Sequence, residues 1–164
     1  MSFIVAFVLL VVGLACWGMG HKAVTDVNKG LADQRIYFPP AGNPAFSSAV
    51  FPDAQKYAGK QVTTGKLAKA YADDVLAVQL KLVGNGKTTF EVGGMAAADP
   101  TNVALQQQQA TMFQLDTSRS LMLLGGYGAS SQAMMMESMG MVALAVAVVL
   151  LLVGGMQWMR YKRA

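Results

Sequence analysis

The sequence predicts an all-α membrane protein in which two transmembrane helices flank a mainly helical extracytoplasmic domain. Hydrophobic residues make up 54% of the 164-residue chain and charged residues only 13%. Soluble domains contain about 45–50% hydrophobic residues and about 25% charged residues. An uncharged apolar run lies near each end of the chain, and apolar residues between the runs recur at helical spacing.

The first apolar run covers residues 3–19 and contains no charged residue. Its length reaches the lower limit of about 17 residues for a spanning helix. We predict that residues 1–20 form an uncleaved signal anchor, because neither a positive start nor a clear cleavage site is present. A cleaved secretory signal is the alternative. Lipid attachment at Cys16, the single cysteine, is disfavoured because Gly13 stands where lipoproteins carry leucine.

The second apolar run predicts a transmembrane helix at residues 139–159, followed by a basic tail at residues 160–164. Lys and Arg beside a short tail place that end in the cytoplasm. An even number of spans then returns the N-terminus to the cytoplasm and leaves residues 21–138 outside the bacterial cell membrane. The predicted membrane-interface anchors are Trp17, Trp158, Arg160, Tyr161, Lys162 and Arg163.

The first part of the domain is predicted to be an extended strap rather than a helix. Prolines at positions 39, 40, 44 and 52 restrain both themselves and the residues before them. Aromatic side chains on this strap would cover a helical core or contact a partner. They are Tyr37, Phe38, Phe46 and Phe51.

Three helices are predicted in the rest of the domain. Apolar spacing indicates an amphipathic helix from about Thr64 to the glycines at 84 and 86. Thr88 and Glu91 form a capping-box pattern that begins a short second helix. Asp99 and Pro100 are predicted to begin the third. That helix has no stop before residues 125–128, where we expect a bend before the second apolar run.

Several stretches form a recognisable set, namely residues 36–40, 57–66 leading into 68–73, 86–92, 111–114 and 117–121. In these stretches the chain resembles a family of small actinobacterial integral membrane proteins of unknown function. The resemblance implies a helical domain outside the membrane and brings no known activity. Some members carry a label of aromatic ring-opening dioxygenase, but non-heme iron oxygenases use two histidines and a carboxylate. His21 is the single histidine, so we reject that label.

The residue inventory predicts a protein that is not an enzyme and binds no cofactor or metal. One histidine and one cysteine cannot supply a usual zinc site. Asp73 and Asp74 would point about 100° apart on a helix instead of converging. Arg119 is either a hydrogen-bond hub or an ordinary exposed arginine. Methionines 134–136 and 139 favour hydrophobic packing over a copper site.

Small residues on both apolar helices would permit close helix contacts, within the chain or between chains. They are Ala6, Gly13, Gly20, Gly140, Ala143, Ala147 and Gly154. Further interface candidates are Leu121, Leu124 and Met135. Neither span contains an ionisable group of the kind that a proton relay uses, which disfavours a transporter.

The resulting hypothesis is a non-catalytic accessory, assembly or scaffold subunit of a bacterial membrane complex, such as a respiratory complex. Its expected partners are membrane lipids and other integral membrane subunits or copies of itself. A homo-oligomeric assembly or pore is one alternative, and an external module that binds a lipid or envelope ligand is another. Nucleic acid is excluded because the central segment is nearly neutral and has no basic stripe.

Overall fold

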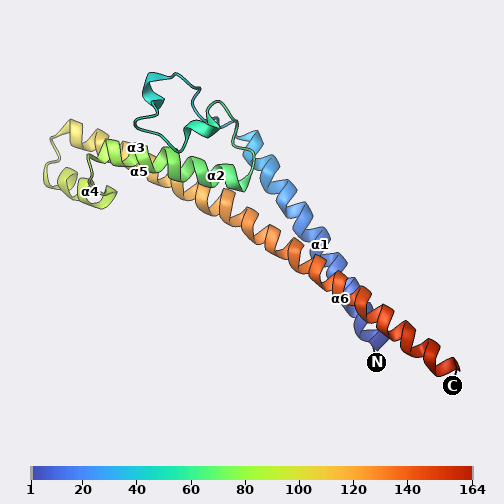
Figure 1. Ribbon diagram of the computed structural model, residues 1–164. Coiled ribbons are helices and arrows are strands. Elements are labelled where there is room, and N and C mark those ends of the chain that lie inside the picture. Colours follow the sequence, from blue (N-terminus) through green and yellow to red (C-terminus); the bar gives the residue numbers. More distant parts are fainter. Residues whose placement is uncertain (1, 164) are drawn as a thin grey trace. The chain divides into compact units, whose positions relative to one another are not determined.

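The computed structural model describes residues 2–163, with side chains from residue 4 to residue 162, and the regular elements in that range are all helical. The all-α prediction is therefore confirmed. The chain divides into two compact units (Figure 1). One is a helix pair made of residues 2–26 and 130–163, and the other is a domain made of residues 27–129.

The helix pair consists of most of α1 (Ser2–Asp33) and α6 (Ala129–Arg163). Both helices are long and apolar enough to cross a membrane. They run antiparallel, so the start of α1 and the end of α6 lie at the same end of the pair (Figure 1). Each helix extends beyond its predicted apolar run because no proline interrupts residues 20–33 or 129–138. Residues 21–26 and 130–138 consequently pack in the pair.

The predicted amphipathic helix forms as α2 (Gly65–Tyr71), the π-helical segment η3 (Ala72–Leu76) and α3 (Ala77–Gly84). The Thr64 hydroxyl caps its start by accepting a hydrogen bond from the Leu67 amide at 3.3 Å. Asn85 ends it with a φ of 49°, the left-handed conformation that terminates many helices. The sequence predicted both ends, whereas the π turn inside the helix was not predicted.

The capping box at the start of α4 (Thr89–Ala98) is confirmed. The predicted start of the third helix is wrong, because α5 (Val103–Leu121) begins three residues after Pro100. Asn102 is its cap and accepts a hydrogen bond from the Leu105 amide at 3.2 Å. The Asp99 carboxylate instead accepts a hydrogen bond from the Thr101 hydroxyl at 2.9 Å, so Asp99 stabilises the turn before the helix.

Residues 122–128 do not end the helix that begins with α5. They form η4 (Met122–Gly128), a π-helical segment that passes into α6, and residues 103–163 are helical throughout. The interruption expected at the glycines therefore takes the form of widened helical turns. Within the domain, Gly126 packs against Ala68 of α2 and Leu31 of α1, where a Cβ would overlap the Ala68 methyl group. Glycine is therefore required at that position.

The segment between α1 and α2 folds back on itself. The Phe38 amide donates to the Lys60 carbonyl and the Val62 amide donates to the Ile36 carbonyl, each at 2.8 Å. Two 3₁₀ turns, Pro44–Phe46 and Gln55–Tyr57, lie between these bonds. The loop delivers buried aromatic side chains to a core shared with α1, α2, η3 and η4. The core residues are Leu31, Phe38, Phe46, Phe51, Ala54, Val62, Ala68, Ala72, Val75, Leu76 and Met122.

Candidate functional site

A seam of small residues joins α1 to α6 in the helix pair. A Cβ on Gly20 would overlap the backbone of Glu137, and one on Gly140 would overlap the backbone of Trp17. A Cβ on Gly13 would lie 3.0 Å from the Leu144 Cγ. The two backbones therefore approach so closely that only glycine fits at Gly20 and Gly140.

The seam follows a seven-residue spacing on both helices. Ala6 and Ala147 are fully buried and extend the seam beyond the glycines. Ala133, seven residues before Gly140, is also buried and was missed by the sequence analysis, although the spacing alone identifies it. Ala143 is half-buried beside the seam, and Gly154 is buried near the end of α6. The small residues are thus occupied by contacts within one chain.

A polar pair lies at the end of the helix pair farther from the start of α1. His21 Nδ1 is 3.1 Å from Glu137 Oε1. The Trp17 ring stacks on the imidazole with a centroid distance of 6.1 Å and an interplanar angle of 27°. Gly20 permits this arrangement by bringing the two backbones together one residue earlier. The structure therefore gives His21 a specific interhelical partner, which the sequence did not predict.

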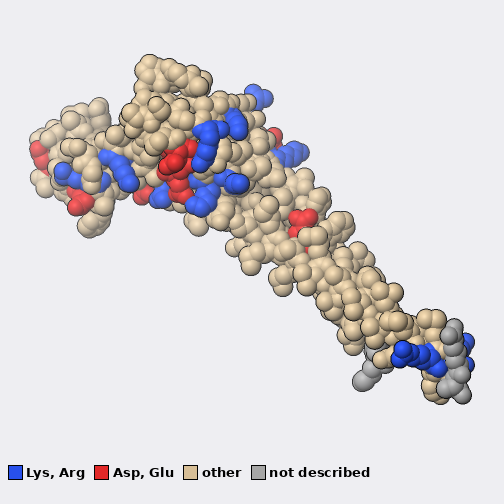
Figure 2. All heavy atoms as spheres, in the orientation of Figure 1, with Lys and Arg blue, Asp and Glu red and all other residues tan. Residues whose placement is uncertain are grey.

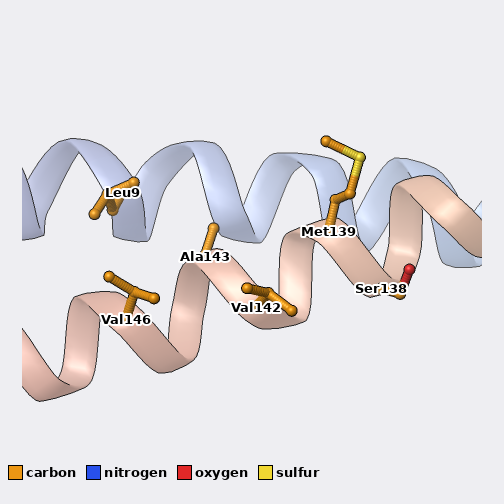
Figure 3. A pocket seen from close by; sticks show the side chains of 6 residues that line it. All are labelled: Leu9, Ser138, Met139, Val142, Ala143 and Val146. Atoms are coloured by element: carbon orange, nitrogen blue, oxygen red, sulfur yellow. The ribbon is translucent and has the colours of Figure 1, made fainter.

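An apolar groove lies beside the seam within the helix pair. Figure 3 shows Leu9 on α1 and the remaining lining side chains on α6, which are Ser138, Met139, Val142, Ala143 and Val146. The Ser138 hydroxyl donates to the Met135 carbonyl at 2.8 Å, so its hydrogen bond is made inside α6. The groove therefore offers a hydrocarbon surface.

The predicted interface anchors near the end of α6 are exposed. Lys162 Nζ lies 4.1 Å from the centre of the Trp158 ring, and Arg160 and Tyr161 also face outward. The Arg163 side chain lies outside the described part of the chain. Blue side chains gather at this end of the molecule and over the domain, whereas the visible face of the helix pair is mostly uncharged (Figure 2). Trp17 differs from the other anchors because it stacks on His21.

A charged network in the domain joins its two π-helical segments. Asp73 in η3 pairs with Lys69 and accepts a hydrogen bond from Arg119 Nη2 at 3.3 Å. Lys69 Nζ also lies 5.6 Å from the centre of the Tyr127 ring in η4. The hydrogen bond from Lys69, with help from Arg119, lowers the pKa of the Asp73 carboxyl, whereas burial raises the pKa of Asp74. Neighbouring carboxyls thus meet different surroundings.

The second groove belongs to the domain and is lined by one of the predicted contact residues, Leu121, whereas Leu124 is exposed in the same segment but does not line the groove. Leu121 and Leu124 are 67% and 76% exposed. The groove is lined by Val27, Gly30, Leu31, Gln34, Leu121, Met122, Gly125 and Gly126. At Gly30 and Gly125 a Cβ would meet nothing within 4 Å, so there is open space beside these two lining residues. Met135, the third candidate, is exposed on α6 in the helix pair.

No group of three His, Cys, Asp or Glu side chains gathers around a possible metal position among residues 2–163. The comparisons with known proteins found no relative. No protein-family model, curated protein or solved structure matches the chain. The resemblance to actinobacterial membrane proteins therefore stays a prediction.

Proposed function

We propose that this chain is a two-span membrane protein that acts as a non-catalytic accessory or scaffold subunit of a bacterial membrane complex. The helix pair would anchor it in the bilayer, and the domain of residues 27–129 would contact a partner subunit on the extracytoplasmic side. Three features support this proposal: the outer surface of the pair, the charges at its end and the groove of the domain.

The outer surface of the helix pair supports a bilayer environment. Large apolar side chains of the pair, such as those of Phe7, Val142 and Leu152, are each more than half exposed. Each square ångström of apolar surface facing water costs about 25 cal/mol. A continuous surface of this kind is typical of a membrane or protein contact. A bilayer would remove that cost along both helices.

The charges support an orientation with both termini in the cytoplasm. Arg160 and Lys162 are exposed at the end of α6, and basic residues beside a span favour the cytoplasmic side. Because α1 and α6 are antiparallel, the start of α1 would lie on that same side. The domain between the two spans would then lie outside.

The observation that carries the accessory role is the exposure of Leu121, which lines a groove together with the open glycines Gly30 and Gly125. Leu124, the residue before Gly125, is also exposed. These leucines lie outside both apolar runs, where lipid tails would not cover them. Glycines on the surface of a groove allow another helix to approach its backbone closely. A helix of a partner subunit would therefore fit this groove better than a small polar ligand.

The test is native mass spectrometry of the tagged chain after mild extraction from its own membrane. We expect a different protein at fixed stoichiometry, lost when Leu121→Ser and Leu124→Ser are combined. The control is Leu82→Ser, which changes another exposed leucine of the domain. A chain that purifies alone, or a partner that the double variant retains, would contradict the proposal.

A homo-oligomer is the second candidate, favoured by the exposed face of α6 that includes Val142 and Val146. The seam glycines are already occupied within the chain, so a second copy would have to use this other face. Multiples of one chain mass in the same experiment would support this candidate. The third candidate, an external module that binds a ligand, has less support from the segment between α1 and α2. Of the four aromatic side chains predicted to form its contact surface, Phe38, Phe46 and Phe51 are buried and Tyr37 is exposed.

A further inference from the structure

We propose that the partner subunit contacts the domain through an uncharged helix that lies along an exposed face of α5 and η4. This inference rests on the proposed accessory role and deepens it, because it names the kind of segment that the partner presents. It also extends the contact from the groove at Leu121 toward the start of α5.

The exposed face has the residue spacing of a helix-packing surface, and we call it the outer face. Steps of four and three residues alternate along it, and each residue at these steps is exposed. The residues are Val103, Gln107, Ala110, Gln114 and Thr117, followed by Leu121 and Leu124. This alternation keeps the side chains on one side of a helix, where a second helix can pack. The opposite side of α5 is already occupied, because Met112 is fully buried in the domain.

The outer face carries no charged residue. The two charged residues of α5 are Asp116 and Arg119, which are half-buried, and Arg119 donates a hydrogen bond to Asp73. By contrast, α2 and α3 expose Lys66 and Lys81. Charged side chains usually occupy the side of a helix that faces water, so an uncharged side of this length indicates a protein contact. A charged partner side chain would lose its hydration here without gaining a counter-charge, and we therefore infer an uncharged partner surface.

The composition of the outer face favours a protein helix over lipid. Val103 and the neighbouring Phe113 are 66% and 65% exposed. Gln107, Gln114 and Thr117 carry amide or hydroxyl groups. Lipid tails would cover the apolar side chains but leave these polar groups without hydrogen bonds. A helix that presents apolar and uncharged polar side chains can satisfy both.

A shallow depression on α5 gives this helix a place to insert a side chain. It is lined by Phe113, Gln114, Thr117 and Ser118, which lie on successive turns of one helix. A gap between four side chains of one helix is the kind of surface that receives a side chain from a facing helix. The groove lined by Leu121 begins about one turn later. One partner helix would therefore cover both depressions continuously.

The first test is photo-crosslinking of the full chain in its own membrane, followed by mass spectrometry of the linked peptides. A photoreactive phenylalanine analogue replaces Gln107, Phe113 or Gln114, one at a time. The control position is Phe90, which is 90% exposed on α4. We expect the three positions on α5 to link to one segment of a different membrane protein. The linked residues of that segment should be uncharged and recur every three or four positions, and Phe90 should give no such link.

The second test adds a charge to the outer face. Thr117→Lys should lower the ratio of partner to chain after mild extraction by about tenfold or more, because the contact would bury an unpaired ammonium group. Thr111→Lys makes the same change at an exposed position of α5 outside the outer face and should retain the partner. Circular dichroism checks that both variants are folded.

The outcomes separate this inference from the accessory role. A partner that co-purifies with the wild type but is retained by folded Thr117→Lys would overturn the inference and leave the accessory role standing. Links from α5 only to lipid or to a second copy of the chain would also overturn it. Recovery of no different protein with the wild type would overturn both. If Thr117→Lys does not fold, the photo-crosslinking decides alone.

Discussion

The helix pair and the domain differ in the contacts that stabilise each of them internally. The pair relies on close backbone approach at Gly20 and Gly140 and leaves most of its large side chains exposed. The domain relies on a buried core in which Phe38 contacts Tyr57 and Tyr71, each with ring centroids 5.2 Å apart. The domain therefore buries large side chains in a core, whereas the pair packs through its backbones and leaves large apolar side chains on its surface.

The largest expected effect concerns the buried aromatic core of the domain. Phe38→Ala should destabilise the domain by about 3–5 kcal/mol, because it empties a fully buried aromatic site. Chemical unfolding followed by circular dichroism would measure the loss. Phe90→Ala is the matched control, since Phe90 is 90% exposed and should change stability little. Equal losses in the two variants would show that the core is misassigned.

The next effect tests the seam. Gly20→Ala should destabilise the helix pair by about 1–3 kcal/mol, because its methyl group would overlap the Glu137 backbone. Gly18→Ala, two residues earlier, would meet nothing within 4 Å and should be tolerated. Unfolding in detergent distinguishes the two variants. A seam that tolerates both substitutions equally would argue against this helix register.

A smaller effect concerns the start of α5. Asn102→Ala should cost about 1 kcal/mol, because the Leu105 amide loses its side-chain acceptor. Asn102→Asp preserves an acceptor at the same position and should recover most of the loss. Thermal unfolding of the full chain measures both variants. If Asp99→Ala proved far more damaging than Asn102→Ala, the cap would belong to Asp99 after all.

The smallest effect concerns the charged network of the domain. Asp73→Asn should cost about 0.2–1 kcal/mol at neutral pH, as is usual for partly exposed pairs. The pKa of Asp73 is lowered in the folded chain by Lys69, so this stability is present above the ordinary carboxyl pKa. It is lost as the pH falls through the lowered value. The wild type and the variant should therefore converge in acid, and a constant difference would contradict this assignment.

The sequence by itself determined the features that depend on neighbours along the chain. The two apolar runs are continuous in the chain, and the capping box of Thr88 and Glu91 and the stop at residues 84–86 each involve residues only a few positions apart. The start of α5 was misplaced because Asp99 and Asn102 both suit a cap, and the choice depends on which one bonds the next turn. The π segment at 72–76 was not predicted, and at 122–128 the glycines predicted an interruption of the helix but not its π-helical form.

Only the tertiary structure decided which distant residues meet. Seven-residue spacing indicated small residues on both apolar helices, yet the register that places Gly20 against Glu137 depends on two segments more than a hundred positions apart. The same register pairs His21 with Glu137. Likewise, the burial of Phe38 and the exposure of Tyr37 follow from how the loop closes through residues 60–62. Such contacts depend on packing across the fold, which local periodicity does not encode.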